Sequence, residues 1–496
     1  MKSIVIRQTR SCLKQASRCR YKPTCAAVRW SSTTPNRQWS TSLAKQLSEA
    51  ITATGPIPLA AFMRMCLTSD VGGYYTSRQE GKDQFGHKGD FTTSPEISQM
   101  FGELIGIWFV TEWMAQGRKS KGVELVEIGP GRGTLMDDLL RTIRNFKSMA
   151  GSIEAVYLVE ASPALREAQK QLLCGDNPMI EAPIGYQSTS KYANIPVFWT
   201  ENIRFVPSDH DKSPFIVAHE FFDALPIHAF QAVAAPDIPQ DTIKTPTGEH
   251  SLAPGAKKPI GPQWREIVVS PTQVPDVLLE LTETKIPSEP ATEFQLTLSK
   301  SSTPHSLYLP EISPRYQALK SLPDSLIEIS PESHAYAQEF AWRIGGTNEV
   351  PKSTPSGAAI ILDYGPADTV PINSLRGIRG HKIVSPLSSP GLVDISADVD
   401  FIALTEAALG ASPGVEVHGP IEQGTFLLGM GIKERAEMLA KGLKDPEKVK
   451  TLEGAWKRLI DRGGSGMGKV YKALAIVPES GGKRTPVGFG GVVTSE

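Results

Sequence analysis

One short stretch constrains the fold of this chain more than any other: residues 123–135 read VELVEIGPGRGTL. Six strand-forming residues run directly into Gly129, Gly131 and Gly133, and a helical pattern follows. A strand, a glycine turn and a helix in this order are typical of the nucleotide-binding start of a doubly wound α/β sheet. The turn lets the backbone approach a ligand, and the helix N-terminus offers free amides.

The sequence around this stretch alternates between strand and helix patterns. Such alternation predicts a parallel sheet covered by helices, and the Pro-, Lys- and Thr-rich sequence after residue 231 predicts an insertion of strands and long loops. The expected strands lie at 123–128, 155–159, 215–218, 264–270, 357–365, 423–432 (QGTFLLGMGI) and 467–477, and the expected helices at 43–53, 58–67, 135–146 and 163–173.

A glycine- and aromatic-rich stretch at 72–95 lacks periodicity and predicts a loop. Two interpretations stay open: the loop closes over a bound cofactor or substrate, or its rings simply pack onto the sheet. A helix is expected next, with Ser94 as N-cap, Pro95 at its first position and an apolar pattern to Phe109. The aromatic residues of the loop are Tyr74, Tyr75, Phe85 and Phe91.

The first 48 residues carry no Asp or Glu and are rich in Arg, Lys and Ser. This composition favours a mitochondrial transit peptide, with a disordered basic arm as the alternative. Without its ten positive charges the formal net charge changes from −1 to about −11, which disfavours general nucleic-acid binding. The remaining cysteines, Cys66 and Cys174, lack metal-ligand spacing, so no metal is expected. No apolar run is long enough to span a membrane.

These patterns predict six segments. They are a transit peptide (1–45), N-terminal helices with the cofactor or substrate loop (46–121), the first part of the core (122–235), the insertion (236–355), the second part of the core with C-terminal strands (356–480), and a flexible tail (481–496).

The spacing of the glycines indicates which nucleotide the turn accepts. The sequence reads G-x-G-x-G, not the G-x-G-x-x-G of dinucleotide sites, because Thr134 stands where the third glycine belongs. With Glu127 two residues before the first glycine, the motif resembles the first motif of class I S-adenosylmethionine-dependent methyltransferases. These enzymes bind ribose hydroxyls through an acidic residue after the second strand, and Glu160 in YLVEAS takes that position.

Further segments resemble the MidA family: GGYYTS, GDFTTSPEISQMFGE, HEFFDALPIHAF, LDYG and LRGIRGHKIVSPLSSPGLVDISADVDF. The resemblance covers about residues 43–477 and implies a Rossmann-like methyltransferase of the mitochondrial matrix that assists assembly of respiratory complex I. It implies symmetric dimethylation of an arginine on the 49-kDa core subunit, with S-adenosylmethionine as donor; a homodimer is possible. The insertion near 239–263 and the SADVDF sequence depart from the family pattern.

An arginine acceptor needs carboxylates beside it, because its guanidinium must approach a positively charged sulfonium. Glu220 and Asp223, in AHEFFDALP after the third predicted strand, are the candidate catalytic residues. Alternatively, Asp223 caps a short helix and Glu220 makes a structural hydrogen bond. The remaining, weaker candidates are Asp363 and Tyr364 after a later strand, and His219 and His228 as proton carriers or buried structural groups.

Two other functions remain open at this point. One is a small-molecule or RNA methyltransferase, although the chain has neither an NPPY-like motif nor a basic stripe. The other is a non-catalytic assembly chaperone that kept the fold. The intact glycine turn together with Glu127 and Glu160 argues against loss of the cofactor site.

Overall fold

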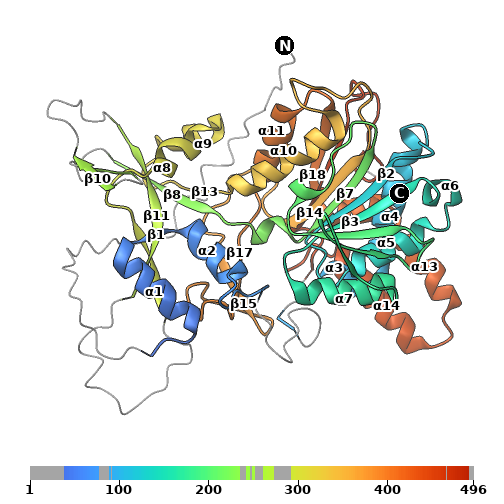
Figure 1. Cartoon of the computed structure of the whole chain (residues 1–496), viewed down its shortest axis with the longest axis horizontal. Coiled ribbons are helices and arrows are strands. Elements are labelled where there is room, and N and C mark those ends of the chain that lie inside the picture. Colours follow the sequence, from blue (N-terminus) through green and yellow to red (C-terminus); the bar gives the residue numbers. More distant parts are fainter. Residues whose placement is uncertain are drawn as a thin grey trace. The chain divides into compact units, whose positions relative to one another are not determined.

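The computed structural model of this chain contains a nine-stranded mixed sheet, drawn on the right of Figure 1. Its strands, in order across the sheet, are β18 (Val415–Glu422), β19 (Tyr471–Pro478), β14 (Ala358–Tyr364), β7 (Ser213–His219), β2 (Val123–Ile128), β3 (Ile153–Val159), β6 (Pro196–Thr200), β5 (Gly185–Thr189) and β4 (Ile180–Ala182). Strands β14 to β6 run parallel, and β19 and β5 run antiparallel to their neighbours. This arrangement confirms the predicted doubly wound α/β fold.

The strand order reverses beside β2, since the chain continues to β3 and β6 on one side and to β7 and β14 on the other. The carboxyl ends of β2, β3, β7 and β14 meet at the same edge, because these strands are parallel. Ligands of doubly wound sheets bind at such a reversal, outside the carboxyl ends of the strands. We therefore expect the ligand site among the residues that follow Ile128, Val159, His219 and Tyr364.

The parallel strands are buried on both faces, so successive side chains enter two different apolar cores. In β14, for example, Ile360 packs in one core and Ile361 in the other. Burial of such a side chain stabilises the fold by roughly 1.5–3 kcal/mol. The helices that contribute to the first core include α4 (Gln99–Ala115), α5 (Thr134–Ile143), α7 (Pro163–Cys174), α12 (Gln423–Gly429) and α14 (Pro446–Ile460), and those in the second include α10 (Pro331–Gly345) and α11 (Phe401–Ala411).

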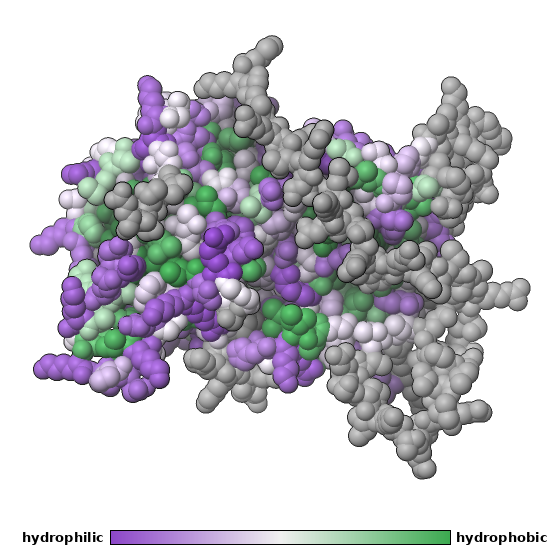
Figure 2. Space-filling view, turned by 180° about the vertical axis from the view of Figure 1, so that it is seen from behind, coloured by the Kyte–Doolittle hydropathy of each residue, from purple (hydrophilic) through white to green (hydrophobic). Residues whose placement is uncertain are grey.

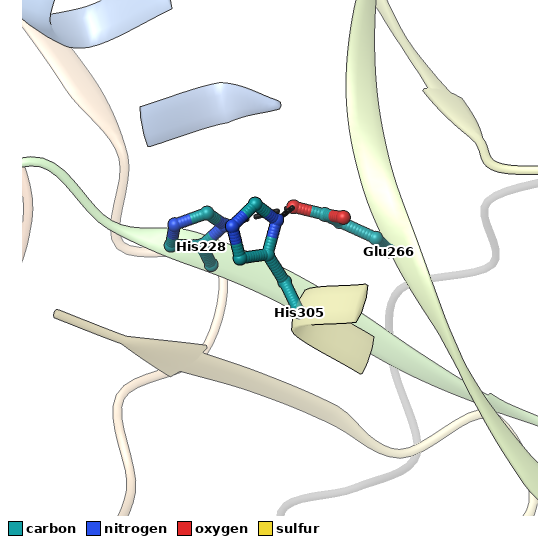
Figure 3. Close-up of side chains that lie close together, drawn as sticks. All are labelled: His228, Glu266 and His305. Carbon is teal, nitrogen blue, oxygen red and sulfur yellow. Dashed lines mark hydrogen bonds and ion pairs between the residues drawn. The ribbon is translucent and has the colours of Figure 1, made fainter. Parts of the chain in front are cut away.

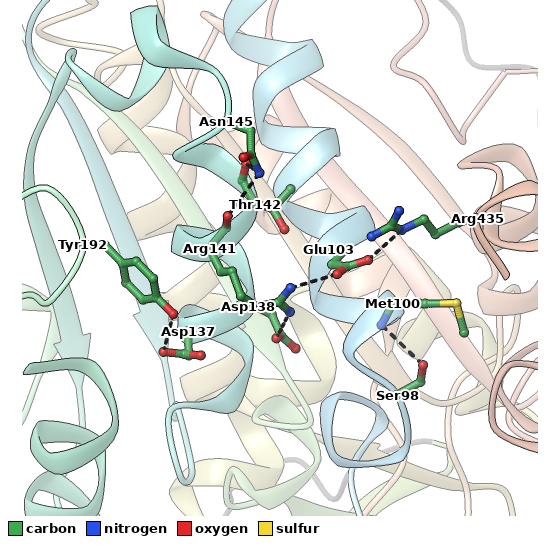
Figure 4. A network of polar contacts seen from close by, with 10 residues as sticks. All are labelled: Ser98, Met100, Glu103, Asp137, Asp138, Arg141, Thr142, Asn145, Tyr192 and Arg435. Carbon is green, nitrogen blue, oxygen red and sulfur yellow. Dashed lines mark hydrogen bonds and ion pairs between the residues drawn. The ribbon is translucent and has the colours of Figure 1, made fainter. Parts of the chain in front are cut away.

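The helix that follows the glycine turn, α5, is fixed to its neighbours by a polar network (Figure 4). Glu103 of α4 accepts hydrogen bonds from Arg141 of α5 and from Arg435 of α13 (Ile432–Gly442), each at 2.9 Å. Burial acts to raise the pKa of Glu103, but the two guanidinium groups outweigh it and lower the pKa. Because Arg141 of α5 pairs with Glu103 of α4, α5 cannot shift along α4 without breaking a charged contact. Arg141 also pairs with Asp138 of its own helix.

A second, smaller sheet is built mainly from the segment between the two parts of the core. Its strand order is β1 (Ile57–Pro58), β11 (Gln263–Pro271), β8 (His228–Val233) and β13 (Leu326–Ile329), with β12 (Phe294–Leu298) also pairing with β11. Its apolar core includes Phe230, Trp264 and Tyr316. Other elements of the structure include the helices α1 (Ser42–Thr54), α2 (Leu59–Thr68), α8 (Pro304–Tyr308) and α9 (Pro314–Leu319). Strands β9 and β10 form a hairpin (Thr242–Thr245, Gly248–Ser251), and β16 (Lys382–Val384), β15 (Arg376–Arg379) and β17 (Asp394–Ser396) form a three-stranded sheet.

Two local predictions were wrong. The stretch at 423–432, expected as a strand, forms helix α12, because its buried residues Gln423, Phe426 and Leu427 recur at helical spacing. The expected N-cap also differs: Thr93 caps α3 (Ser94–Ile97), and its N–H donates to the Glu96 carboxylate at 3.3 Å. The expected single helix is broken at Ser98, which is extended and caps α4 with its hydroxyl.

The structure describes residues 38–76, 89–90, 92–234, 242–245, 248–251, 261–272, 292–464 and 466–490. Most of the predicted transit peptide (1–45), Phe85, Phe91 and the last six residues of the predicted tail (481–496) lie outside these ranges. The segment boundaries remain predictions; α10, within the predicted insertion, packs on the nine-stranded sheet.

Within these ranges, no helix is both long and apolar enough to cross a membrane. Figure 2 shows hydrophilic side chains among separate hydrophobic groups on the face that it displays. Cys66 and Cys174 are both buried free thiols. The two cysteines that the structure describes therefore form no disulfide with each other.

Candidate functional site

The glycine turn follows β2 directly and leads into α5. The N–H of Gly129 donates to the carbonyl of Val159 at 3.0 Å, which ties the turn to the end of β3. Gly129, Gly131 and Gly133 have φ values of +64°, +53° and +83°. These backbone conformations cost little only for glycine. The positive φ values therefore explain why glycine occupies all three positions of the motif.

Two of these glycines also meet close neighbours. A Cβ at Gly129 would lie 2.8 Å from Cδ2 of Phe221, and one at Gly133 would lie 3.2 Å from Cγ of Gln169. The first contact joins the turn after β2 to the turn after β7. The glycine turn and the acidic residues around Phe221 are thus parts of one site.

Glu127 and Glu160 lie at the ends of adjacent parallel strands, as the sequence predicted. Glu127 is 3 % exposed, and its Oε2 has no hydrogen-bond partner among the described residues. Burial raises its pKa well above the usual range, and the charge of Glu160 adds to this effect. Burial also raises the pKa of Glu160, to about 7. The strand ends thus hold two carboxyl groups that can accept further hydrogen bonds.

Gln169 of α7 organises this part of the site and was missed by sequence reasoning. Its Nε2 donates to the carbonyl of Gly131 at 2.6 Å and to Oε2 of Glu160 at 3.2 Å. Its Oε1 accepts from the indole of Trp199 at 3.0 Å. The available signal was a polar residue on the buried stripe of a helix, beside Leu173. Gln169 therefore joins the glycine turn to the strand-end carboxylate.

Glu220 and Asp223 follow β7 and form the second half of the site. Glu220 has a φ of +49°, a strained conformation for a residue with a side chain, and its N–H donates to the carbonyl of Leu362 at 2.9 Å. Oε1 of Glu220 and Oδ1 of Asp223 are buried and have no hydrogen-bond partner in the part of the chain that the structure describes. Burial raises the pKa of both carboxyl groups, and their mutual repulsion raises that of Glu220 further.

Asp363 and Tyr364, the weaker candidates, support this acidic turn from β14. Asp363 Oδ2 accepts the backbone N–H groups of Phe221 at 3.1 Å and Phe222 at 2.8 Å. The Tyr364 hydroxyl donates a short hydrogen bond to Asp223 Oδ2. Asp363 thus stabilises the backbone of the turn, whereas Tyr364 contacts a candidate catalytic carboxylate directly.

Residues remote in the sequence complete the acidic site. The Tyr75 hydroxyl donates to Oδ1 of Asp394 at 2.8 Å. Burial raises the pKa of Asp394 to about 7, and the nearby charge of Asp223 contributes. Tyr471 packs edge-on against Tyr364, with ring centroids 5.3 Å apart. We call Glu220, Asp223 and Asp394, with Tyr75 and Tyr364, the acidic cluster.

The two candidate histidines lie in different places. His219 is buried at the end of β7, where its Nε2 lies 3.2 Å from Oε1 of Glu220. Burial lowers its pKa to about 3, so the imidazole is neutral at physiological pH. His228 begins β8 of the second sheet, where it contacts Glu266. Of the two, only His219 contacts the acidic cluster.

The sheet order, the glycine turn and the paired strand-end glutamates together define a class I methyltransferase fold. A family model described as "Putative S-adenosyl-L-methionine-dependent methyltransferase" matches residues 104–421. The chain belongs to this family, the MidA-like family that its motifs indicated. S-adenosylmethionine is accordingly the cofactor.

Relatives from several animals match most of the chain. It is 34 % identical over 443 residues to the bovine "Protein arginine methyltransferase NDUFAF7, mitochondrial", covering 88 % of this chain and 84 % of the relative. Identity to the Xenopus tropicalis protein of the same name is 35 %, with 92 % and 91 % covered. The Drosophila melanogaster homolog is 35 % identical, with 88 % and 85 % covered.

A solved structure supports the fold. A crystal structure from Burkholderia thailandensis that holds S-adenosyl-homocysteine matches with a TM-score of 0.58 and 21 % sequence identity. The match covers 91 % of this chain and 93 % of that chain. At this identity the likeness establishes a shared fold.

Proposed function

We propose that this chain transfers methyl groups from S-adenosylmethionine to an arginine of a protein substrate. The observation that carries the proposal is the acidic cluster, in which two buried carboxylate oxygens lack hydrogen-bond partners among the described residues. Leaving such groups unpaired costs free energy in a purely structural role. A guanidinium group offers five N–H donors in a planar fork and a full positive charge, which suits this cluster.

In this proposal the glycine turn and the strand-end glutamates hold the cofactor. The unpaired Oε2 of Glu127 and the remaining lone pairs of Glu160 accept hydrogen bonds from its amino or ribose hydroxyl groups. Gly129, Gly131 and Gly133 keep side chains away from it. When bound, S-adenosylmethionine supplies an electrophilic methyl group on a positively charged sulfur.

The acidic cluster overcomes the electrostatic difficulty of this reaction. Two unit positive charges about 4 Å apart repel by on the order of 4 kcal/mol at an effective dielectric constant near 20. Glu220 and Asp223 offset this repulsion and orient the guanidinium. Its positive charge lowers their raised pKa values, so the carboxyl groups ionise when the acceptor binds. Glu220 Oε1, which accepts no hydrogen bond from the described residues, then takes up the proton that the arginine loses.

The proposed substrate is the 49-kDa core subunit of respiratory complex I, with symmetric dimethylation as the reaction and complex I assembly as its purpose. This choice rests on the family resemblance. Relatives named as mitochondrial arginine methyltransferases support it, as does the acid-free, basic sequence of residues 1–48, which favours import into the mitochondrial matrix. A homodimer is a further part of this proposal.

The two other functions are less well supported by the site. A non-catalytic chaperone would have no use for unpaired buried carboxylates beside a complete glycine turn. A small-molecule methyltransferase is compatible with the cofactor half of the site. The names of the relatives favour an arginine acceptor instead.

A methylation assay tests the proposal. The purified protein is incubated with labelled S-adenosylmethionine and the recombinant 49-kDa subunit, and the product is hydrolysed to amino acids. We expect label in symmetric dimethylarginine, and none when the subunit's arginines at the labelled positions are replaced by lysine. Cofactor binding without any protein labelling would contradict the arginine assignment.

A further inference from the structure

Three polar side chains converge in the second sheet, away from the nine-stranded sheet (Figure 3). His228 comes from β8, Glu266 from β11 and His305 from α8. Nδ1 of His228 lies 2.8 Å from Oε1 of Glu266, and Nδ1 of His305 lies 3.4 Å from the same oxygen. The two imidazole rings are 4.2 Å apart between centroids. The methyltransferase reaction proposed above uses none of these groups.

The composition and spacing of this cluster suit a metal ion. One ligand atom from each of the three residues lies within 4.8 Å of the others. Zinc binds imidazole nitrogen and carboxylate oxygen at about 2.0–2.2 Å in tetrahedral geometry, which places neighbouring ligand atoms roughly 3.3 Å apart. The His305–Glu266 distance already fits, and the His228–Glu266 pair needs to open by only a few tenths of an ångström. We propose that His228, Glu266 and His305 form a Zn²⁺-binding site.

The surroundings of Glu266 prepare it as a ligand. The Thr303 hydroxyl donates to Oε2 of Glu266, which leaves Oε1 directed at the two imidazoles. The carboxylate is therefore held with one oxygen toward the two imidazoles before any ion arrives. Support of this kind beyond the direct ligands is common in metal sites.

The site is open on one side. The His228 side chain is 10 % exposed and that of Glu266 is 1 % exposed, whereas the His305 side chain is 46 % exposed. Zinc can enter past His305 and keep water as its fourth ligand. Once bound, the ion joins two strands and a helix that are far apart in the sequence. The site therefore acts as a clip in the second sheet, and it does not depend on the proposed methyltransferase activity.

Titration of Zn²⁺ into the chelator-stripped, reduced full-length protein tests this proposal. We expect one equivalent to bind by calorimetry and to raise the melting temperature. His305→Gln should weaken binding by more than about 100-fold, because loss of even an indirect partner costs about 10–100-fold. The exposed position of His305 makes unfolding of this variant a minor concern, and a circular dichroism spectrum checks it.

A matched control is His418→Gln. His418 also contacts a glutamate, with its Nε2 3.2 Å from Oε1 of Glu416, but it belongs to no group of three ligands among the described residues. This variant should bind Zn²⁺ like the parent protein. Equal affinity of parent and His305→Gln, or no binding by the parent, would overturn the site. A sulfur-to-metal charge-transfer band with Co²⁺ would overturn it as well, by placing the ion on cysteine.

Discussion

Gly131, in the middle of the glycine turn, is the residue at which we test the role of the turn. Gly129 and Gly133 meet Phe221 and Gln169 at close range, so substitutions there disturb packing as well. Gly131→Val places a branched side chain in the turn at a φ of +53°. We expect the folded variant to lose S-adenosylmethionine binding in calorimetry.

Gly175→Val is the matched control. Gly175 ends α7 with a φ of +58°, and a Cβ there would meet nothing within 4 Å. The control therefore also places a branched side chain at a positive φ but does not enter the turn, and it should keep its cofactor affinity. If Gly131→Val binds the cofactor as well as Gly175→Val does, the turn has only a structural role.

The raised pKa of Glu160 predicts that the stability of the folded protein depends on pH. Its pKa is raised from 4.5 to about 7 in the folded protein by burial. A group with a raised folded pKa keeps its full contribution below the unfolded pKa and loses it as the pH rises toward the folded value. Between about pH 4.5 and 7, Glu160 should thus lower the free energy of unfolding by up to about 3 kcal/mol.

Urea unfolding of the cofactor-free protein and of Glu160→Gln at pH 5 and pH 8 measures this effect. The variant shares every other buried carboxyl group with the parent, so the difference between their pH responses isolates Glu160. We expect the parent to lose more stability than the variant on going to pH 8. Equal pH responses of the parent and Glu160→Gln would contradict the description of Glu160 as a buried group that is uncharged at low pH.

Among the elements, α7 links Glu160, at the end of β3, and β6 to the glycine turn through Gln169. Gln169→Met keeps the length of the side chain but removes its hydrogen bonds to Gly131, Glu160 and Trp199. We expect affinity for S-adenosylmethionine to fall by about 10-fold, the effect of losing one or two net hydrogen bonds. Gln169 is a positioning residue here, so KM for the cofactor should rise while kcat is largely kept.

The same helix offers a control at Gln171, which is exposed. Gln171→Met makes the same chemical change on the outer side of α7 and should alter neither parameter. A fall in kcat with an unchanged KM in Gln169→Met would contradict a positioning role.

The elements also show what sequence patterns can and cannot predict. Strands β2, β3, β7 and β14 are mainly apolar and alternate with helical patterns, so their place in a buried parallel sheet was predictable. The run at 423–432 is equally apolar, and its short length hid the helical spacing of Phe426 and Leu427. Short apolar runs of this kind fit either structure until tertiary packing decides.

On the scale of the whole molecule, the acidic cluster shows the limit of sequence reasoning. Glu220 and Asp223 were found because they directly follow a strand of the central sheet. Asp394, in the small β17 strand, and its partner Tyr75 come from segments more than three hundred residues apart. No local pattern relates such residues, and only the folded chain brings them to one place.

In the proposed reaction, separate sets of carboxylates hold the cofactor and the acceptor arginine. Glu220→Gln and Asp223→Asn keep the size of the side chains but remove the charges that face the acceptor. Affinity for S-adenosylmethionine should stay nearly intact, while methyl transfer falls by a factor on the order of 10² or more. A melting curve for each variant controls for unfolding.

The most direct test is therefore to measure cofactor affinity and turnover side by side in these two variants, with the 49-kDa subunit as methyl acceptor. We expect binding and turnover to separate: parent-like calorimetric affinity together with a turnover reduced on the order of 10²-fold. Turnover at the parent rate in both folded variants would contradict it, and so would a loss of cofactor affinity that matches the loss of turnover.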